Sequence, residues 1–98
     1  MKTYDEIITY EIDKNDPKKA SFTLLYEELT TPELKTITEF FKRQKIANNI
    51  RFREKINTDK KTHTYYIILN DGIDIDSLKS ALDNNLTNNF IFPMSNLI

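Results

Sequence analysis

Two neighbouring stretches of the chain decide the fold, residues 50–57 and 62–70, which read Ile50-Arg51-Phe52-Arg53-Glu54-Lys55-Ile56-Asn57 and Thr62-His63-Thr64-Tyr65-Tyr66-Ile67-Ile68-Leu69-Asn70. In the first stretch apolar and charged residues alternate, which is the period of a half-buried strand. In the second, residues 64–69 are apolar on both faces, so this strand should be central in a sheet. The polar residues 58–61 between them predict a hairpin.

The segments before this hairpin predict another hairpin and a helix. Alternating residues predict strands over residues 4–12 and 21–27, joined by a turn over residues 14–19. A helix is predicted over residues 31–46, with Thr31 as its cap and Pro32 at its first position, or with Thr30 and Glu33 as a capping box. The apolar stripe of this helix comprises Leu34, Ile37, Phe40 and Phe41.

The segments after the hairpin predict a short helix and a last strand. The helix should begin at Asp74 or Asp76, either of which can cap it, and end at Asn84. Its inward residues are expected to be Ile75, Leu78, Ala81 and Leu82. A short strand is predicted over residues 90–92.

The predicted order is therefore ββαββαβ, an α+β class, in one domain over residues 1–98. Without the first strand the order is βαββαβ, which predicts a ferredoxin-like two-layer sandwich, a mostly antiparallel sheet with two helices on one face. The N-terminal strand is an addition to it. In element order and spacing, residues 20–92 resemble an ACT-type domain, and this resemblance implies the sensing of a small ligand.

Composition excludes several classes of protein. The 98 residues contain no cysteine and one glycine, Gly72, which rules out disulfides, thiolate metal sites and glycine-rich phosphate loops. The chain contains no run of 18 apolar residues that could span a membrane, and its N-terminal residues lack an apolar signal core. A cytoplasmic protein is therefore expected. His63 is the single histidine, and no group of residues has the pattern of a catalytic site. We therefore expect no enzyme, no cofactor and no metal.

The net charge of −1 conceals a segregation along the chain. Residues 1–34 carry four basic and eight acidic side chains, a net −4. Residues 35–61 carry nine basic and three acidic side chains, a net +6, and residues 62–98 carry one basic and four acidic side chains, a net −3. A surface that only served solubility would interleave the signs, so the basic segment indicates a binding surface.

Residues 42–61 are the candidate binding surface of a small non-enzymatic module. Arg51, Arg53 and Lys55 should share one face of a strand, and Tyr66 or Tyr65 of the next strand should lie beside them. Cations with an aromatic ring on an open sheet face suit a nucleic acid, most specifically DNA, and the hairpin tip could also act as a wing in a groove. The predicted contact residues are Lys42, Arg43, Lys45, Arg51, Arg53, Lys55, Lys60, Lys61 and Tyr66.

Other interpretations of the same sequence stay open. The acidic segments could neutralise the basic one, within one chain or across a homodimer, or the basic surface could bind an acidic protein. The chain could be a regulatory protein, either a homodimer or an inhibitor encoded by a phage, a plasmid or another mobile element. A small-ligand sensor is the third alternative.

Overall fold

The computed structural model of the chain describes residues 3–90, which form the following elements: α1 Tyr4–Ile7, β1 Ile8–Ile12, β2 Lys19–Leu25, the short 3₁₀-helix η1 Tyr26–Glu28, α2 Thr31–Ala47, β3 Arg51–Asn57, β4 Thr62–Ile68 and α3 Ile75–Phe90. Between residues 3 and 90, no helix is both long and apolar enough to cross a membrane.

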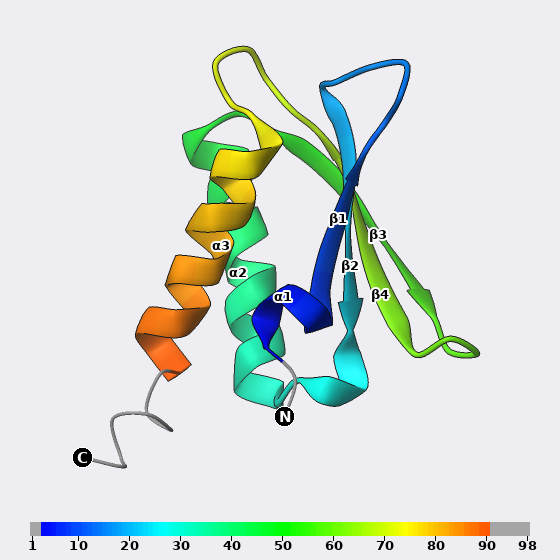
Figure 1. The fold of residues 1–98 in the computed structure, drawn as a ribbon. Helices are drawn as coiled ribbons and strands as arrows, with labels where there is room; N and C mark the ends of the chain where they lie inside the picture. Colours follow the sequence, from blue (N-terminus) through cyan, green and yellow to red (C-terminus); the bar gives the residue numbers. More distant parts are fainter. Residues whose placement is uncertain (1–2, 91–98) are drawn as a thin grey trace.

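The four strands form one antiparallel sheet in the order β1-β2-β4-β3. The strand over residues 62–68 is internal, as its two apolar faces predict. Since β2 and β3 both run antiparallel to β4, they run parallel to each other, and α2 connects them across the helical layer. Figure 1 shows the helices on one face of the sheet. The predicted α+β class with two layers is thus confirmed.

Aromatic rings form the centre of the core between the two layers. Phe22 of β2, Phe41 of α2 and Tyr65 of β4 are fully buried. The rings of Phe41 and Tyr65 stack with centroids 4.3 Å apart, and the Tyr65 hydroxyl lies 3.1 Å from Thr38 Oγ1. Burial raises the pKa of Tyr65 to about 12. Each such ring stabilises the fold by ~2–3 kcal/mol relative to an exposed position.

The start of α2 follows the second of the two predicted alternatives. Thr30, not Thr31, is the N-cap. The Thr30 hydroxyl accepts a hydrogen bond from the Glu33 N–H at 3.3 Å, and Glu33 Oε1 accepts one from the Thr30 N–H at 2.7 Å. This capping box satisfies two backbone donors, and Pro32 lies in the first turn, where a missing N–H is harmless. The predicted inward residues Ile37 and Phe41 are fully buried.

The N-terminal prediction of a strand over residues 4–12 is wrong in its first half. Residues Tyr4–Ile7 form α1, and Ile8–Ile12 form β1. The Glu6 carboxylate accepts hydrogen bonds from the Thr3 N–H at 2.8 Å and from the Thr3 hydroxyl at 3.2 Å. This local pairing favours one helical turn over an extended chain.

The next strand begins and ends two residues earlier than predicted. β2 runs over Lys19–Leu25 in place of residues 21–27, and Tyr26–Glu28 form η1. The Asp13 N–H donates to the Lys19 carbonyl at 2.9 Å, which continues the β1–β2 ladder to the turn.

The last helix is longer than predicted, because α3 continues beyond Asn84 to Phe90. Leu82 and Leu86, four residues apart, are fully buried, and Phe90 packs against the same core. Burial of this stripe outweighs the weak helix preference of the asparagines between its members.

The predicted strand over residues 90–92 is not supported at Phe90, which ends α3. Residues 91 and 92 lie outside the described residues. At the edge of the sheet beside β2, the neighbouring strand is β1. The N-terminal strand that the sequence placed as an addition is therefore an integral edge strand of the sheet.

Candidate functional site

Among the described residues, all helices lie on one face of the sheet, and none covers the opposite face. Phe22 of β2, Phe52 of β3 and Tyr65 of β4 contact Phe41 of α2, so the side chains at alternate positions of these strands point away from the helices. We call this surface the open face. Its members are Thr9 and Glu11 of β1; Lys19, Ser21 and Thr23 of β2; Thr64, Tyr66 and Ile68 of β4; and Arg51, Arg53 and Lys55 of β3.

Strand register aligns the open face in rows that cross the sheet. Arg53 lies opposite Tyr66, Tyr66 opposite Ser21, and Ser21 opposite Glu11. The Arg53 guanidinium carbon lies 4.7 Å from the centroid of the Tyr66 ring, which is a cation–π contact. The predicted proximity of Tyr66 to the strand cations is therefore a direct contact.

The row on one side of this contact is basic. Arg51 lies opposite Ile68, which lies opposite Lys19, so an apolar side chain separates two cations. The row on the other side holds Lys55 opposite Thr64. Three basic side chains of β3 and one of β2 thus share the open face.

A shallow depression of about 520 Å³ occupies one end of the open face. The row of Arg53 and Tyr66 and the row of Arg51 and Ile68 contribute to its lining, and so does the end of β1. Its polar lining residues are Glu11, Asp13, Lys19, Ser21, Arg51 and Arg53, and its exposed apolar ones include Tyr66 and Ile68. The depression is large enough for a nucleobase or a similar planar group.

The carboxylates of the acidic segments that form ion pairs do so outside the open face. Lys18, in the turn after β1, pairs with Asp71, and Lys79 of α3 pairs with Asp5 and Asp83. Among residues 3–90, no ion pair joins Arg51, Arg53 or Lys55 to a carboxylate. Within the described part of one chain, the cations of the open face are therefore not neutralised by direct pairing.

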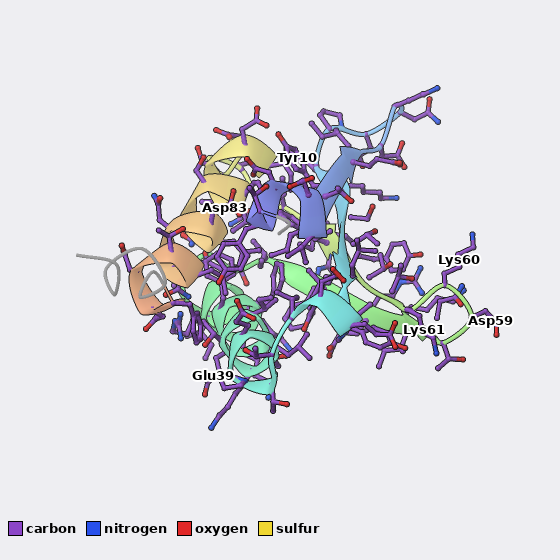
Figure 2. All side chains as sticks on the ribbon, turned by 60° about the horizontal axis from the view of Figure 1, so that its bottom comes forward. Tyr10, Glu39, Asp59, Lys60, Lys61 and Asp83 are labelled. Carbon is purple, nitrogen blue, oxygen red and sulfur yellow. The ribbon has the colours of Figure 1, made fainter. Side chains whose placement is uncertain are left out.

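The nine predicted contact residues lie in three separate places. Arg51, Arg53, Lys55 and Tyr66 lie together on the open face. Figure 2 shows Lys60 and Lys61 at the tip of the β3–β4 hairpin, away from the helices.

The remaining three predicted residues lie in the helical layer. They are exposed on α2, which covers the opposite face of the sheet, and comprise Lys42, Arg43 and Lys45. The fold thus separates a segment that is continuous in sequence.

The sequence prediction omitted Lys19, Ser21 and Glu11 from the site. The alternation Lys19-Ala20-Ser21-Phe22 already indicates that Lys19 and Ser21 share the face opposite Phe22. Their positions opposite Tyr66 and Ile68 require the β2–β4 pairing, which joins Ser21 to Tyr66, 45 positions away, and Lys19 to Ile68, 49 positions away.

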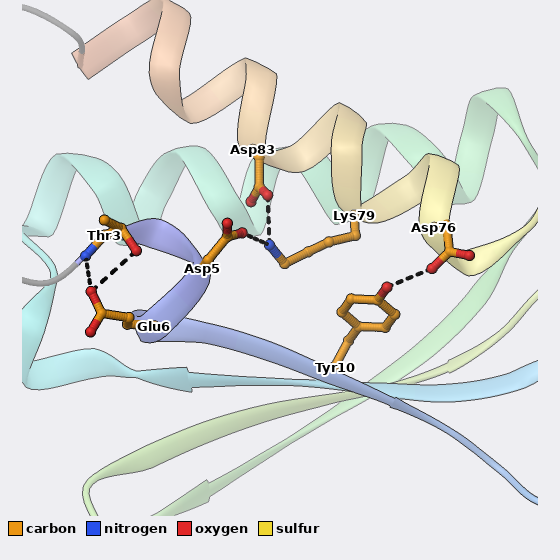
Figure 3. A network of polar contacts seen from close by, with 7 residues as sticks. All are labelled: Thr3, Asp5, Glu6, Tyr10, Asp76, Lys79 and Asp83. Atoms are coloured by element: carbon orange, nitrogen blue, oxygen red, sulfur yellow. Dashed lines mark hydrogen bonds and ion pairs between the residues drawn. The ribbon is translucent and has the colours of Figure 1, made fainter.

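A second concentration of charge lies where α1 meets α3, and we call Asp5, Lys79 and Asp83 the Lys79 cluster. Ala81 was among the residues of this helix predicted to face inward, but it is exposed, whereas Lys79 is buried. The Lys79 ammonium donates to Asp5 Oδ1 at 3.0 Å and to Asp83 Oδ2 at 2.6 Å (Figure 3). Nearby, the Tyr10 hydroxyl donates to Asp76 at 2.5 Å.

The two carboxyl groups of the Lys79 cluster respond differently to their surroundings. The Lys79 ammonium lowers the pKa of the exposed Asp5 carboxyl. Burial raises the pKa of Asp83, and Asp83 Oδ1 is buried without a hydrogen-bond partner among the described residues. Paired charge and a lysine stem inside the fold indicate a structural role for this cluster.

No group of three or more potential ligand side chains among residues 3–90 is arranged to hold a metal ion. His63, the single histidine, lies on the internal strand β4 with 14% of its side chain exposed. Its ring stacks on Tyr65 at 4.6 Å, and its Nε2 lies 3.0 Å from Glu54 Oε1.

Comparison with known protein families, with curated proteins and with solved structures found no match to this chain. The geometry and charge of the open face are therefore the basis for the proposal that follows.

Proposed function

We propose that this protein is a non-enzymatic module that binds single-stranded nucleic acid on its open face. The observation that carries the proposal is the Arg53–Tyr66 contact on the open face, between the edge strand β3 and its neighbour β4, with Arg51 and Lys55 on the same face of β3. Arginine and lysine side chains neutralise phosphates, while aromatic rings and guanidinium planes stack on unpaired bases.

The shape of the surface favours a single strand over a duplex. Reading a duplex groove requires a helix or a ribbon that projects into it. Here α2 and α3 pack on the sheet, and the four-stranded sheet presents a broad face to solvent. The exposed bases of a single strand can lie flat on such a face.

The finer fold assignment is part of this proposal. The order β2-α2-β3-β4-α3 follows the first five elements of a ferredoxin-like domain, and we infer that β1 replaces its last strand at the sheet edge. This arrangement would leave the open face uncovered from β1 to β3.

The test compares two triple variants that each remove three positive charges. The first is Arg51→Ala/Arg53→Ala/Lys55→Ala on the open face. The second, the matched control, is Lys42→Ala/Arg43→Ala/Lys45→Ala on α2. Fluorescence anisotropy would follow labelled single strands of ~12 nucleotides, as DNA and as RNA, and the corresponding duplex.

We expect the open-face variant to weaken single-strand binding by more than ~10-fold at ~50 mM salt and the α2 variant by less than ~3-fold. The slope of log K against log salt concentration should fall by ~2 for the open-face variant, since each lost phosphate contact removes ~0.7. No binding at low salt, or equal losses in the two variants, would overturn the proposal.

A further inference from the structure

The row that holds the Arg53–Tyr66 contact has opposite charges at its two ends. Arg53 lies on one edge strand and Glu11 on the other, with Tyr66 and Ser21 between them. With strands ~4.8 Å apart, the two end Cα atoms are separated by ~14 Å. The Arg53 guanidinium lies over Tyr66 of the neighbouring strand, so it is closer to Glu11 than the Arg53 Cα is.

A carboxylate at this position is not explained by phosphate binding, because it repels phosphates. Glu11 is exposed, lines the 520 Å³ depression and forms no ion pair with another residue of the range 3–90. Asp13, the other acid of the depression, already accepts a hydrogen bond from the Asn15 N–H at 2.7 Å. Glu11 is therefore the acceptor that a ligand can use.

The chemistry of a carboxylate selects among the bases. A carboxylate only accepts, and its two oxygens lie side by side. Guanine is the common base whose Watson–Crick edge presents two adjacent donors, N1–H and the 2-amino group. Adenine and cytosine present one amino group beside an acceptor, and uracil presents one N–H between two carbonyl oxygens, which a carboxylate repels.

Ser21 suits the same orientation of the base. It lies directly opposite Glu11, on the side of Tyr66, and its hydroxyl can donate. With the guanine N1–H and 2-amino group on Glu11, the neighbouring O6 requires a donor, which the Ser21 hydroxyl supplies. The base then stacks on the Arg53–Tyr66 contact, and its phosphate reaches the cations of β3.

We infer that the open face reads the base as well as the backbone, and that Glu11 gives it a preference for guanine. This inference rests on the proposed function, because it assumes that a single strand lies on the open face.

The test uses short uridine-rich RNA strands that carry guanine, hypoxanthine, adenine or cytosine at alternate positions. Hypoxanthine is guanine without the 2-amino group, so the pair isolates one donor. Anisotropy would be measured for the wild-type chain, for Glu11→Gln and for the matched control Glu39→Gln, which removes an exposed acid from α2.

For the wild-type chain we expect guanine strands to bind ~5–10-fold more tightly than hypoxanthine strands, and more tightly still than adenine strands. In Glu11→Gln the guanine preference should fall below ~2-fold, while the other strands bind as well as before or better, since a negative charge is gone. Glu39→Gln should keep the full preference. Unchanged thermal melting of both variants would exclude misfolding.

The two proposals fail in different ways. Tight binding that is equal for all four strands, or a guanine preference that survives Glu11→Gln, overturns the role of Glu11 and leaves single-strand binding standing. Absence of binding for every strand at low salt overturns both.

Discussion

The Lys79 cluster and the open face each concentrate charge, but only in the first does every cation have a carboxylate beside it. Lys79 is 7% exposed and contacts two aspartates, whereas Arg51, Arg53 and Lys55 are exposed and have no ion pair among the described residues. Paired charge inside a fold fixes one element against another, here α1 against α3. Unpaired charge on a surface adds little to stability and is free for a partner.

The largest expected effect comes from breaking the paired region. Lys79→Met removes the ammonium and leaves Asp83 half-buried without its cation, so we expect a loss of ~2–4 kcal/mol in the free energy of unfolding at neutral pH, measured by urea denaturation. Lys18→Met breaks the exposed pair with Asp71 and should leave the denaturation midpoint nearly unchanged.

A double variant makes this prediction sharper. In Lys79→Met/Asp83→Leu the uncompensated carboxylate is removed with the lysine, so the double variant should be more stable than Lys79→Met alone. If Lys79→Met unfolds at the wild-type urea concentration, the cluster does not hold α1 to α3, and the contrast between the two regions fails.

A substitution on the open face can supply the carboxylate that its cations lack. Ile68 is 40% exposed between Arg51 and Lys19, so Ile68→Glu would place a carboxylate between two cations. Cross-strand pairs of this kind change stability by less than ~1 kcal/mol. Single-strand binding, in contrast, should weaken by ~5–10-fold at ~50 mM salt, since the added carboxylate lowers the net positive charge of the face by one and competes with phosphates for the two flanking cations.

Ile68→Gln is the control, because it has the same length without the charge. Binding of the Gln variant should stay within ~2-fold of the wild type if charge is what matters. Equal binding by the Glu and Gln variants would show that the cations of this row do not contact the ligand.

The two regions also differ in how far the sequence predicts them. Alternation in residues 51–55 is enough to place three cations on one strand face, and the apolar character of residues 64–69 is enough to make β4 internal. These signals are local and depend only on the period of a strand. They predict the β3 half of the open face correctly.

What the sequence did not predict depends on contacts between distant residues. Lys79 is a charged residue on a helix, which favours an exposed position, and its partner Asp5 is 74 positions away in the chain. Likewise, Glu11 and Ser21 share a row with Tyr66 only because β1 pairs with β2, and β2 with β4, in one register. A periodic pattern shows which side chains share a face but not which strands are neighbours.

A smaller effect is expected at the start of α3, where the acid acts through hydrogen bonds. Asp74 accepts from the Ser77 N–H at 2.8 Å and from the Ser77 hydroxyl at 3.2 Å, and these bonds lower the pKa of Asp74. Asp74→Ala should therefore lower the melting temperature at neutral pH.

The pH dependence of this effect has a definite sign. The pKa of an unfolded aspartate is ~3.9, and the pKa of Asp74 in the fold is lower. Its stabilisation is thus complete above about pH 4 to 5 and is lost as the pH falls through the folded value. The difference in melting temperature between the wild type and Asp74→Ala should shrink below about pH 4. A difference that stays constant to about pH 2 would exclude the capping role.

The smallest effect is expected at the hairpin tip, which belongs to neither region. Lys61 has φ 58°, a left-handed conformation that favours glycine. Lys61→Gly should raise the free energy of unfolding by ~0.5–1 kcal/mol, whereas Lys60→Gly, at a residue without a positive φ, should not. Each variant removes one cation away from the open face, so single-strand binding should stay within ~2-fold of the wild type. A loss as large as that of the open-face triple variant would move the binding surface from the sheet face to the tip, and the hairpin would then act as a wing.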